Sequence, residues 1–168
     1  AVDKLGKTTL SANVAVELGD GAPISLRGGG EVASVALNGY DYKNISVVAD
    51  IEDDRIATSV GIADEALMVD LQALADISDK AMPAYDAVMR IDRADLHAMN
   101  INHRDSISVL KGNVGLSVRG ASADEMNGVL RIAEAEYETV GRECDADLVE
   151  ISIESNEDAR RLSLVSDF

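Results

Sequence analysis

Three consecutive residues near the start of the chain have the chemistry of a phosphate-binding turn. They are Gly6, Lys7 and Thr8, and Thr9 follows them. Glycine lets the backbone approach an oxyanion, a lysine ammonium supplies positive charge, and a threonine hydroxyl can ligate magnesium. The segment therefore indicates a polyphosphate site. The alternative is an ordinary helix N-terminus capped by Thr8 or Thr9, with no ligand.

A helix is the element that would position this turn. Leu10, Val14 and Leu18 recur every four residues directly after it, and this spacing favours an amphipathic helix over residues 10–18. The free N–H groups and partial positive charge at the start of such a helix would face the phosphates.

The segment GKTTLSANVAVEL, which begins at Gly6, resembles the start of the ParA/MinD family of P-loop ATPases. The resemblance implies an α/β fold, a layered and mostly parallel sheet with helices on both faces, in one P-loop NTPase-like domain over residues 1–168. It also implies that Gly6, Lys7, Thr8 and Thr9 bind ATP. The family has Lys-Gly-Gly where this chain has Val-Asp-Lys, and no room remains upstream for the strand that feeds the loop. Either the chain begins inside the domain or the loop is degenerate.

A second window supports the same resemblance. Residues 44–50 (NISVVAD) have the nearly continuous apolar run of a strand buried on both faces, and acidic residues follow them. The wider segment VADIEDDRIATSVGI resembles the family's second acidic motif. The resemblance implies that Asp50 orients the attacking water or the Mg²⁺ shell and that Glu52 is the second acid. Thr8, Asp50 and Glu52 would then be the Mg²⁺ ligands, with Lys7 and Asp50 as the catalytic pair.

Further elements follow from patterning. Amphipathic spacing favours helices over 63–77, 122–137 and 155–165, whereas 85–99 fits either a helix or a short strand (87–91) leading into one. Strands are expected at 23–27, 31–37, 107–110, 114–118 and 147–153, a hairpin turn at Asn38-Gly39, and a mobile turn at Gly28-Gly29-Gly30. His97 and His103 lack acidic partners at ligand spacing, so we expect surface histidines.

Composition limits the function further. The 168 residues carry 31 acidic and 15 basic side chains, a net charge of −16, which disfavours nucleic acid and anionic lipid as direct partners. The same excess of acids fits a halophilic source. The single cysteine, Cys144, excludes an internal disulfide and fits a reducing cytoplasm. No apolar run has the roughly 20 residues needed to span a bilayer.

Two functions follow as hypotheses. The ParA/MinD resemblance implies an ATP- and Mg²⁺-dependent positioning switch that forms a homodimer, or a pseudo-ATPase scaffold, because residues 137–144 make a poor Walker B strand. The second hypothesis has no chemistry: VAVELGDGAPISLRGGGEVASVAL and GLSVRGASADEM resemble strand-rich parts of an archaeal sliding clamp. On that interpretation residues 14–18 form a strand, and the protein is a DNA processivity or scaffold protein.

Overall fold

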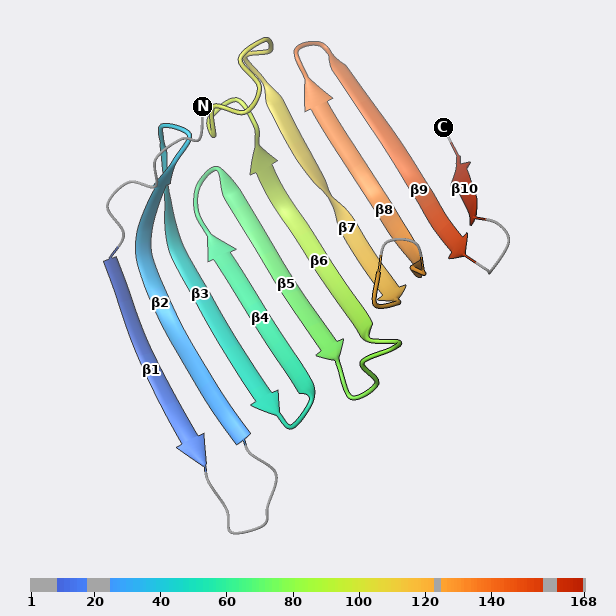
Figure 1. The fold of residues 1–168 in the computed structure, drawn as a ribbon. Helices are drawn as coiled ribbons and strands as arrows, with labels where there is room; N and C mark the ends of the chain where they lie inside the picture. The colour runs from blue at the N-terminus through green and yellow to red at the C-terminus, as the bar shows by residue number, and fades with distance from the viewer. Residues whose placement is uncertain (1–8, 18–24, 123–124, 156–159, 168) are drawn as a thin grey trace.

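The protein folds into a single antiparallel sheet, in a computed structural model that describes residues 9–17, 25–122, 125–155 and 160–167. Ten strands within these residues lie side by side in chain order, each antiparallel to the next (Figure 1). Their bounds are β1 (Thr9–Glu17), β2 (Ser25–Leu37), β3 (Tyr40–Glu52), β4 (Arg55–Ala63), β5 (Leu67–Asp76), β6 (Ala84–Asp95), β7 (Ser108–Arg119), β8 (Asn127–Thr139), β9 (Arg142–Ser155) and β10 (Arg160–Ser166).

Short turns make consecutive strands neighbours. Asn38 and Gly39 have φ of 55° and 74° between the paired residues Leu37 and Tyr40. Positive φ at both central residues defines the tight hairpin turn whose twist matches that of the flanking strands. The hairpin expected at Asn38-Gly39 is thus confirmed. In the turn between β8 and β9, Gly141 alone has a positive φ, of 70°.

The expected α/β fold is wrong, because the described residues contain no helix and no parallel strand pair. The segments expected to be helical, over 10–18, 63–77, 122–137 and 155–165, instead contain β1, β5, β8 and β10 wherever they are described. Residues 85–99, for which a helix and a strand both fitted, contain most of β6. The P-loop NTPase-like architecture assigned to residues 1–168 is therefore also wrong.

The physical reason is an ambiguity of period. Apolar residues that recur every four positions lie on one face of a helix. They also lie on one face of a strand, because side chains on a strand return to the same face every two residues. In β5 the odd positions Val69, Leu71, Ala73 and Ala75 alternate with outward-facing neighbours such as Asp70. Alternation over a whole segment indicates a strand, and it was present in the sequence.

The triple glycine is the second correction. Gly28, Gly29 and Gly30 were expected to form a mobile turn, but they lie in the middle of β2, paired with Ala49, Val48 and Val47 of β3. The strands expected at 23–27 and 31–37 are, where described, parts of this one long strand. Those expected at 107–110 and 114–118 are likewise one strand, β7, interrupted by a bulge at Gly112.

The sheet forms one layer within the described residues. Each strand contacts its neighbours in the sheet, and no second sheet or helix packs on either face. The buried apolar side chains among the described residues are accordingly few: Ala66, Pro83, Ala94, Met99, Val109 and Ala146. An antiparallel sheet ordinarily packs one face on a core. Here that face must be identified from the register of the strands.

Candidate functional site

Of the four residues predicted to bind phosphate, the structure describes one, Thr9. Gly6, Lys7 and Thr8 are outside the described residues. Thr9 is the first residue of β1, and the chain continues from it as a strand. ATP binding at these residues stays a prediction from the sequence, now without the helix on which the prediction depended.

The two predicted acids lie on β3, away from Thr9. Asp50 is 3.8 Å from the Nε atom of Arg27, and Glu52 pairs in register with Arg55 across the β3–β4 turn. Thr9 pairs with residue 34 near the opposite end of β2, so the structure does not bring these positions together. No group of three His, Cys, Asp or Glu side chains in the described ranges is arranged to hold a metal ion.

The register reveals a different feature, an apolar face that crosses the sheet from β2 to β10. Side chains opposite each other in antiparallel strands point to the same side. We call this side the apolar face. It consists of every second residue of nine strands: 26–32 (even numbers) of β2, 45–51 (odd) of β3, 56–62 (even) of β4, 69–75 (odd) of β5, 85–91 (odd) of β6, 114–118 (even) of β7, 128–132 (even) of β8, 149–153 (odd) of β9 and 162–164 (even) of β10. Apart from Thr58 and three glycines, all of these residues are apolar or tyrosine.

The opposite side, which we call the polar face, carries the intervening residues. Cross-strand ion pairs recur on it, with Arg55 3.1 Å from Asp76, Arg90 3.0 Å from Asp70, and Arg131 2.6 Å from Glu150. These side chains are solvated and need no covering layer. The two faces of one sheet therefore differ in chemistry along their whole extent.

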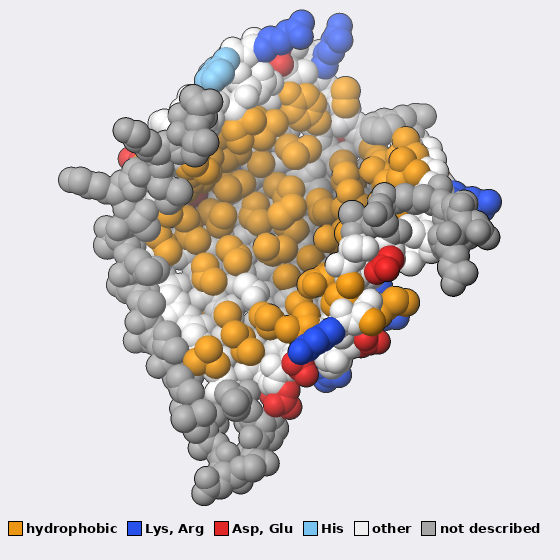
Figure 2. Space-filling view, viewed as in Figure 1, with side chains coloured by type: hydrophobic (Ala, Val, Ile, Leu, Met, Phe, Trp, Pro, Cys, Tyr) orange, Lys and Arg blue, Asp and Glu red, His pale blue; other side chains and the backbone are white. Residues whose placement is uncertain are grey.

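The apolar face is hollowed. Figure 2 looks onto it and shows apolar side chains gathered over the middle strands, in a depression with charged residues at its border. Over β3 and β4 the exposure agrees with this shape: on the polar face Val48 is 43% exposed, whereas Val47 and Val60 on the apolar face are half-buried. Toward β10 the apolar face is open, since Leu162 and Leu164 are 70% and 65% exposed. In the described part of the chain, no second sheet or helix covers Val47 and Val60.

A line of bulges crosses the sheet near one end of the apolar face. The register shifts at Met68/Val69 in β5, at Ile91/Ala94 in β6 and at Lys111/Asn113 in β7. Asn44 in β3 and Glu134 in β8 have φ of 53° and 51° on the same line. Bulges bend a strand and increase its twist. The sheet is therefore bent along this line.

The β6–β7 connection closes that end. We call residues 96–107 the end wall; they lie at the upper end of the sheet in Figure 1. Met99 of the end wall is 2% exposed and packs with Ala66 and Ala94, and Ile91 of the apolar face adjoins this cluster. The end wall thus continues the apolar face into the small core.

Polar contacts fix the end wall to the sheet. The Asn38 side chain donates to the carbonyl of Asn100 at 2.7 Å, and Asn100 donates back to the carbonyl of Asn38 at 3.1 Å. Asn102 donates to Ser108 Oγ at 3.0 Å, and Ser108, which is fully buried, lies 2.9 Å from the Tyr137 hydroxyl. These hydrogen bonds join the end wall to the β2–β3 turn and to β7 and β8.

A buried carboxylate supports the neighbouring β4–β5 turn. Asp64 is 5% exposed and accepts hydrogen bonds from the Tyr40 hydroxyl and from the amides of Lys43 and Ala66. Burial raises the pKa of Asp64, but these hydrogen bonds outweigh it and hold the pKa below its ordinary value. The hydrogen bond to Asp64, with burial, raises the pKa of Tyr40 to about 12. The pair has a structural role, because its polar atoms are taken up by the turn.

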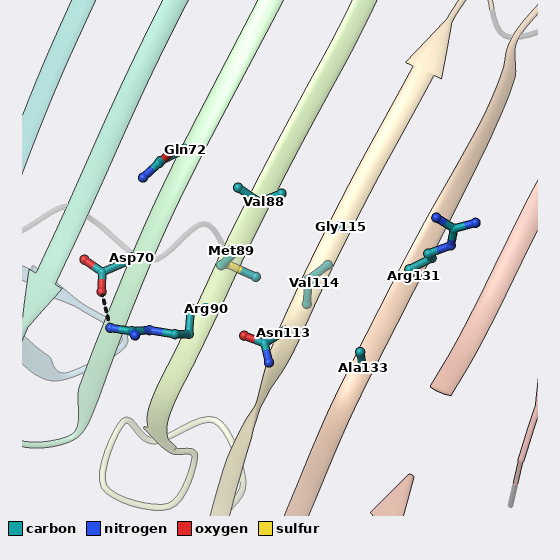
Figure 3. A pocket seen from close by; sticks show the side chains of 10 residues that line it. All are labelled: Asp70, Gln72, Val88, Met89, Arg90, Asn113, Val114, Gly115, Arg131 and Ala133. Atoms are coloured by element: carbon teal, nitrogen blue, oxygen red, sulfur yellow. Dashed lines mark hydrogen bonds and ion pairs between the residues drawn. The ribbon is translucent and has the colours of Figure 1, made fainter. Parts of the chain in front are cut away.

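The polar face has a shallow groove over β5–β8, with a volume of about 570 Å³ (Figure 3). Gly115 forms its floor, and Gln72, Arg90 and Arg131 stand around it. Both arginines already pair with carboxylates, Arg90 with Asp70 and Arg131 with Glu150. The groove therefore offers no unpaired cation for an anionic ligand, and the apolar face remains the stronger candidate site.

Comparison with known proteins gives no assignment: no family model, curated protein or solved structure matches the chain. In the described part of the chain there is no helix with the length and hydrophobicity needed to cross a membrane.

Sequence reasoning missed the apolar face. The signal that could have found it is the strict alternation in segments such as RIATSVGIA (β4) and LMVDLQALAD (β5), in which every second residue is apolar or small. Which positions face each other across strands is visible only from the register.

Proposed function

We propose that the protein binds the alkyl chains of an amphiphile on its apolar face. The observation that carries this proposal is the continuous apolar surface from β2 to β10, with no covering layer in the described residues. Apolar surface of this extent on a soluble domain ordinarily marks a binding site.

The chemistry of the face favours hydrocarbon over a polar ligand. The backbone N–H and C=O groups beneath it are paired between strands, and among its residues Thr58 and Tyr85 alone carry a side-chain hydroxyl. The polar groups of a ligand bound there would lose their hydration without finding hydrogen-bond partners on the protein. An alkyl chain has no such groups, so its burial is favourable throughout.

Shape and charge argue against a second copy of the chain as the occupant. Two hollowed faces brought together would touch mainly at their borders (Figure 2). Each chain also carries a net charge of −16, which opposes association at low salt. The same charge disfavours anionic headgroups, so we propose a neutral or zwitterionic amphiphile.

The test is a binding titration with a phosphatidylcholine that carries a fluorophore on one acyl chain. The wild-type chain should give saturable binding. Leu71→Lys, which places an ammonium in the middle of the apolar face, should weaken binding at least tenfold, because the charge must be desolvated under the ligand. Gln72→Lys changes the adjacent residue on the polar face and is the matched control.

Equal binding by the two variants, or no binding by the wild-type chain, would contradict the proposal. Sedimentation of the same samples identifies the competing occupant: a dimer that Leu71→Lys dissociates and that excludes the probe would assign the face to self-association.

A further inference from the structure

The last strand, β10, forms one edge of the sheet in the part of the chain that the structure describes. It pairs there with β9 alone, whereas each of β2 to β9 lies between two strands (Figure 1). Proteins usually protect an edge strand with proline, a bulge or charged side chains. The sequence of β10, RRLSLVS, has no proline, its register with β9 does not shift, and its charges are confined to the first two positions. The rest of this edge therefore lacks the usual protection.

The backbone groups that point outward from this edge include those of Leu162 and Leu164. Asp167, just beyond the strand, donates its amide to the carbonyl of Leu148 at 3.3 Å, in continuation of the β9–β10 register. Hydrogen-bonded and non-hydrogen-bonded pairs alternate along an antiparallel ladder. The odd-numbered residues of β10 are therefore the ones hydrogen-bonded to β9, and the N–H and C=O groups of Leu162 and Leu164 point away from β9.

The side chains of this edge are apolar and exposed. Leu162 and Leu164 on the apolar face are 70% and 65% exposed, and Val165 on the polar face is 57% exposed. Outward backbone groups and exposed apolar side chains thus occur together on one short strand. Main-chain hydrogen bonds and burial of alternate side chains are the two contributions that hold an added strand.

We propose that β10 pairs with β10 of a second copy of the chain, antiparallel and across a two-fold axis at Ser163. In this register Leu162 of each copy lies opposite Leu164 of the other. The two leucines exchange their outward backbone hydrogen bonds, and their side chains cover each other on the apolar face. An axis at Leu162 or at Leu164 would instead place one leucine opposite an arginine or a serine, with less apolar contact.

Charge favours the antiparallel direction. Arg160 and Arg161 begin β10, no acidic residue lies within it, and Asp167 follows its end. Antiparallel pairing separates the arginines of the two copies and makes Arg161 of one copy a diagonal neighbour of Asp167 of the other. The net charge of −16 per chain opposes association, so the dimer should strengthen as salt is added.

This dimer leaves the apolar face uncovered. A two-fold axis perpendicular to the sheet keeps the two apolar faces on the same side of one continuous sheet. The inference is therefore independent of the proposed binding function. Leu71→Lys, which changes the middle of the apolar face, should leave the dimer intact.

The first test is sedimentation at low and high NaCl with a proline at the edge. The wild-type chain should form a dimer whose fraction increases with salt. Leu164→Pro removes an N–H that points away from β9, so it keeps the β9–β10 hydrogen bonds and should weaken the dimer at least tenfold. Leu164→Ala keeps this N–H, is the matched control and should dimerise more tightly than Leu164→Pro. Leu162→Pro repeats the test should Leu164→Pro fail to fold.

A cross-link tests the register. In a Cys144→Ser background, Ser163→Cys places two thiols at a non-hydrogen-bonded pair whose Cα atoms are about 4.5 Å apart, within disulfide range. Oxidation should give a covalent dimer. Ser152→Cys is the control, because Ser152 lies beside Ser163 on β9 and is half-buried like it. Its two copies would be roughly three strand spacings, about 14 Å, apart and should not cross-link.

Three results would overturn the proposal. The first is a wild-type chain that stays monomeric at every salt concentration, and the second is a dimer that the proline variants retain or that Leu71→Lys dissociates. The third is a series of larger oligomers, because a two-fold axis closes the assembly at two copies. Equal cross-linking of Ser163→Cys and Ser152→Cys would contradict the register.

Discussion

The two faces of the sheet alternate along the same backbone, yet they stand in different surroundings. On the polar face, charged residues such as Arg131 and Glu150 pair across strands in contact with water. On the apolar face, residues such as Val60 and Leu71 are half-buried. A sheet of several strands draws its independent stability from packing one face. Among the described residues, the end wall supplies such packing only locally.

This difference predicts that substitutions act by face and by distance from the end wall. The largest loss is expected for Met99→Ala, because Met99 is 2% exposed in the small core. Replacing a buried methionine by alanine costs about 2–5 kcal/mol. Met68→Ala, at a position 45% exposed, is the control and should cost less than about 0.5 kcal/mol. Urea unfolding of both variants measures the two losses in the free energy of unfolding. Equal losses would show that Met99 and the end wall do not stabilise the sheet more than an exposed position does.

The next largest effect is expected for Tyr40→Phe. The variant leaves the buried Asp64 carboxylate without one donor, which costs about 1–3 kcal/mol. Tyr85→Phe, on the exposed part of the apolar face, should be nearly neutral. Both are measured by urea unfolding at neutral pH.

The same pair predicts a pH dependence. The folded pKa of Tyr40, about 12, exceeds the ordinary value of 10.0, so its contribution is complete below pH 10 and is lost as the pH rises toward 12. The pKa of Asp64 is lowered, so its contribution is present above the ordinary carboxylate pKa and is lost as the pH falls below it. The alkaline loss should become smaller in Tyr40→Phe; burial and Asp64 also raise the pKa of Tyr42, which keeps the remaining part. An unchanged alkaline profile in that variant would contradict the assignment to Tyr40.

A smaller difference is expected between two leucines of β5. Leu71 is half-buried on the apolar face and Leu74 is 45% exposed on the polar face. Truncation to alanine should cost about 1–2 kcal/mol at Leu71, since part of its surface is already shielded, and about 0.5 kcal/mol or less at Leu74. Thermal unfolding of the two variants gives the comparison. A larger loss at Leu74 would mean that the polar face carries the packing.

The smallest effect is expected for the ion pairs of the polar face. A double-mutant cycle with Arg131→Gln and Glu150→Gln should give a coupling energy of about 0.2–1 kcal/mol, because the arginine is well solvated. The coupling should decrease as salt is added. A coupling energy that does not change in high salt would indicate a buried ion pair and would contradict the exposure of Arg131.

The sequence predicted local features better than the fold. The Asn38-Gly39 turn and the strand at 44–50 were found because their signals depend on neighbouring residues. The prediction of helices over 63–77 and 122–137 was wrong, because an apolar residue at every fourth position fits one face of a helix and also one face of a strand. The residues Gly6 to Thr9 predict a P-loop fold, whereas the alternation in β4 and β5 predicts the strands that the structure contains.

The candidate site could not be predicted from the sequence, because it depends on how the strands pair. One row of the apolar face contains Val47, Val60, Leu71 and Met89, which have no reactive group and no fixed spacing along the chain. They form a line only when each strand takes its register against the next. The register in turn depends on turn geometry and bulges. A pattern of this kind becomes visible from the pairing of the strands.

The most direct test of the central claim is paramagnetic broadening of methyl NMR signals by a phosphatidylcholine that carries a nitroxide on one acyl chain. Valines on adjacent positions of β3 face opposite sides, Val47 on the apolar face and Val48 on the polar face. The account predicts strong broadening at Val47, Val60 and Leu71 and little at Val48 and Val88. Equal broadening on both faces, or broadening confined to Val48 and Val88, would contradict it.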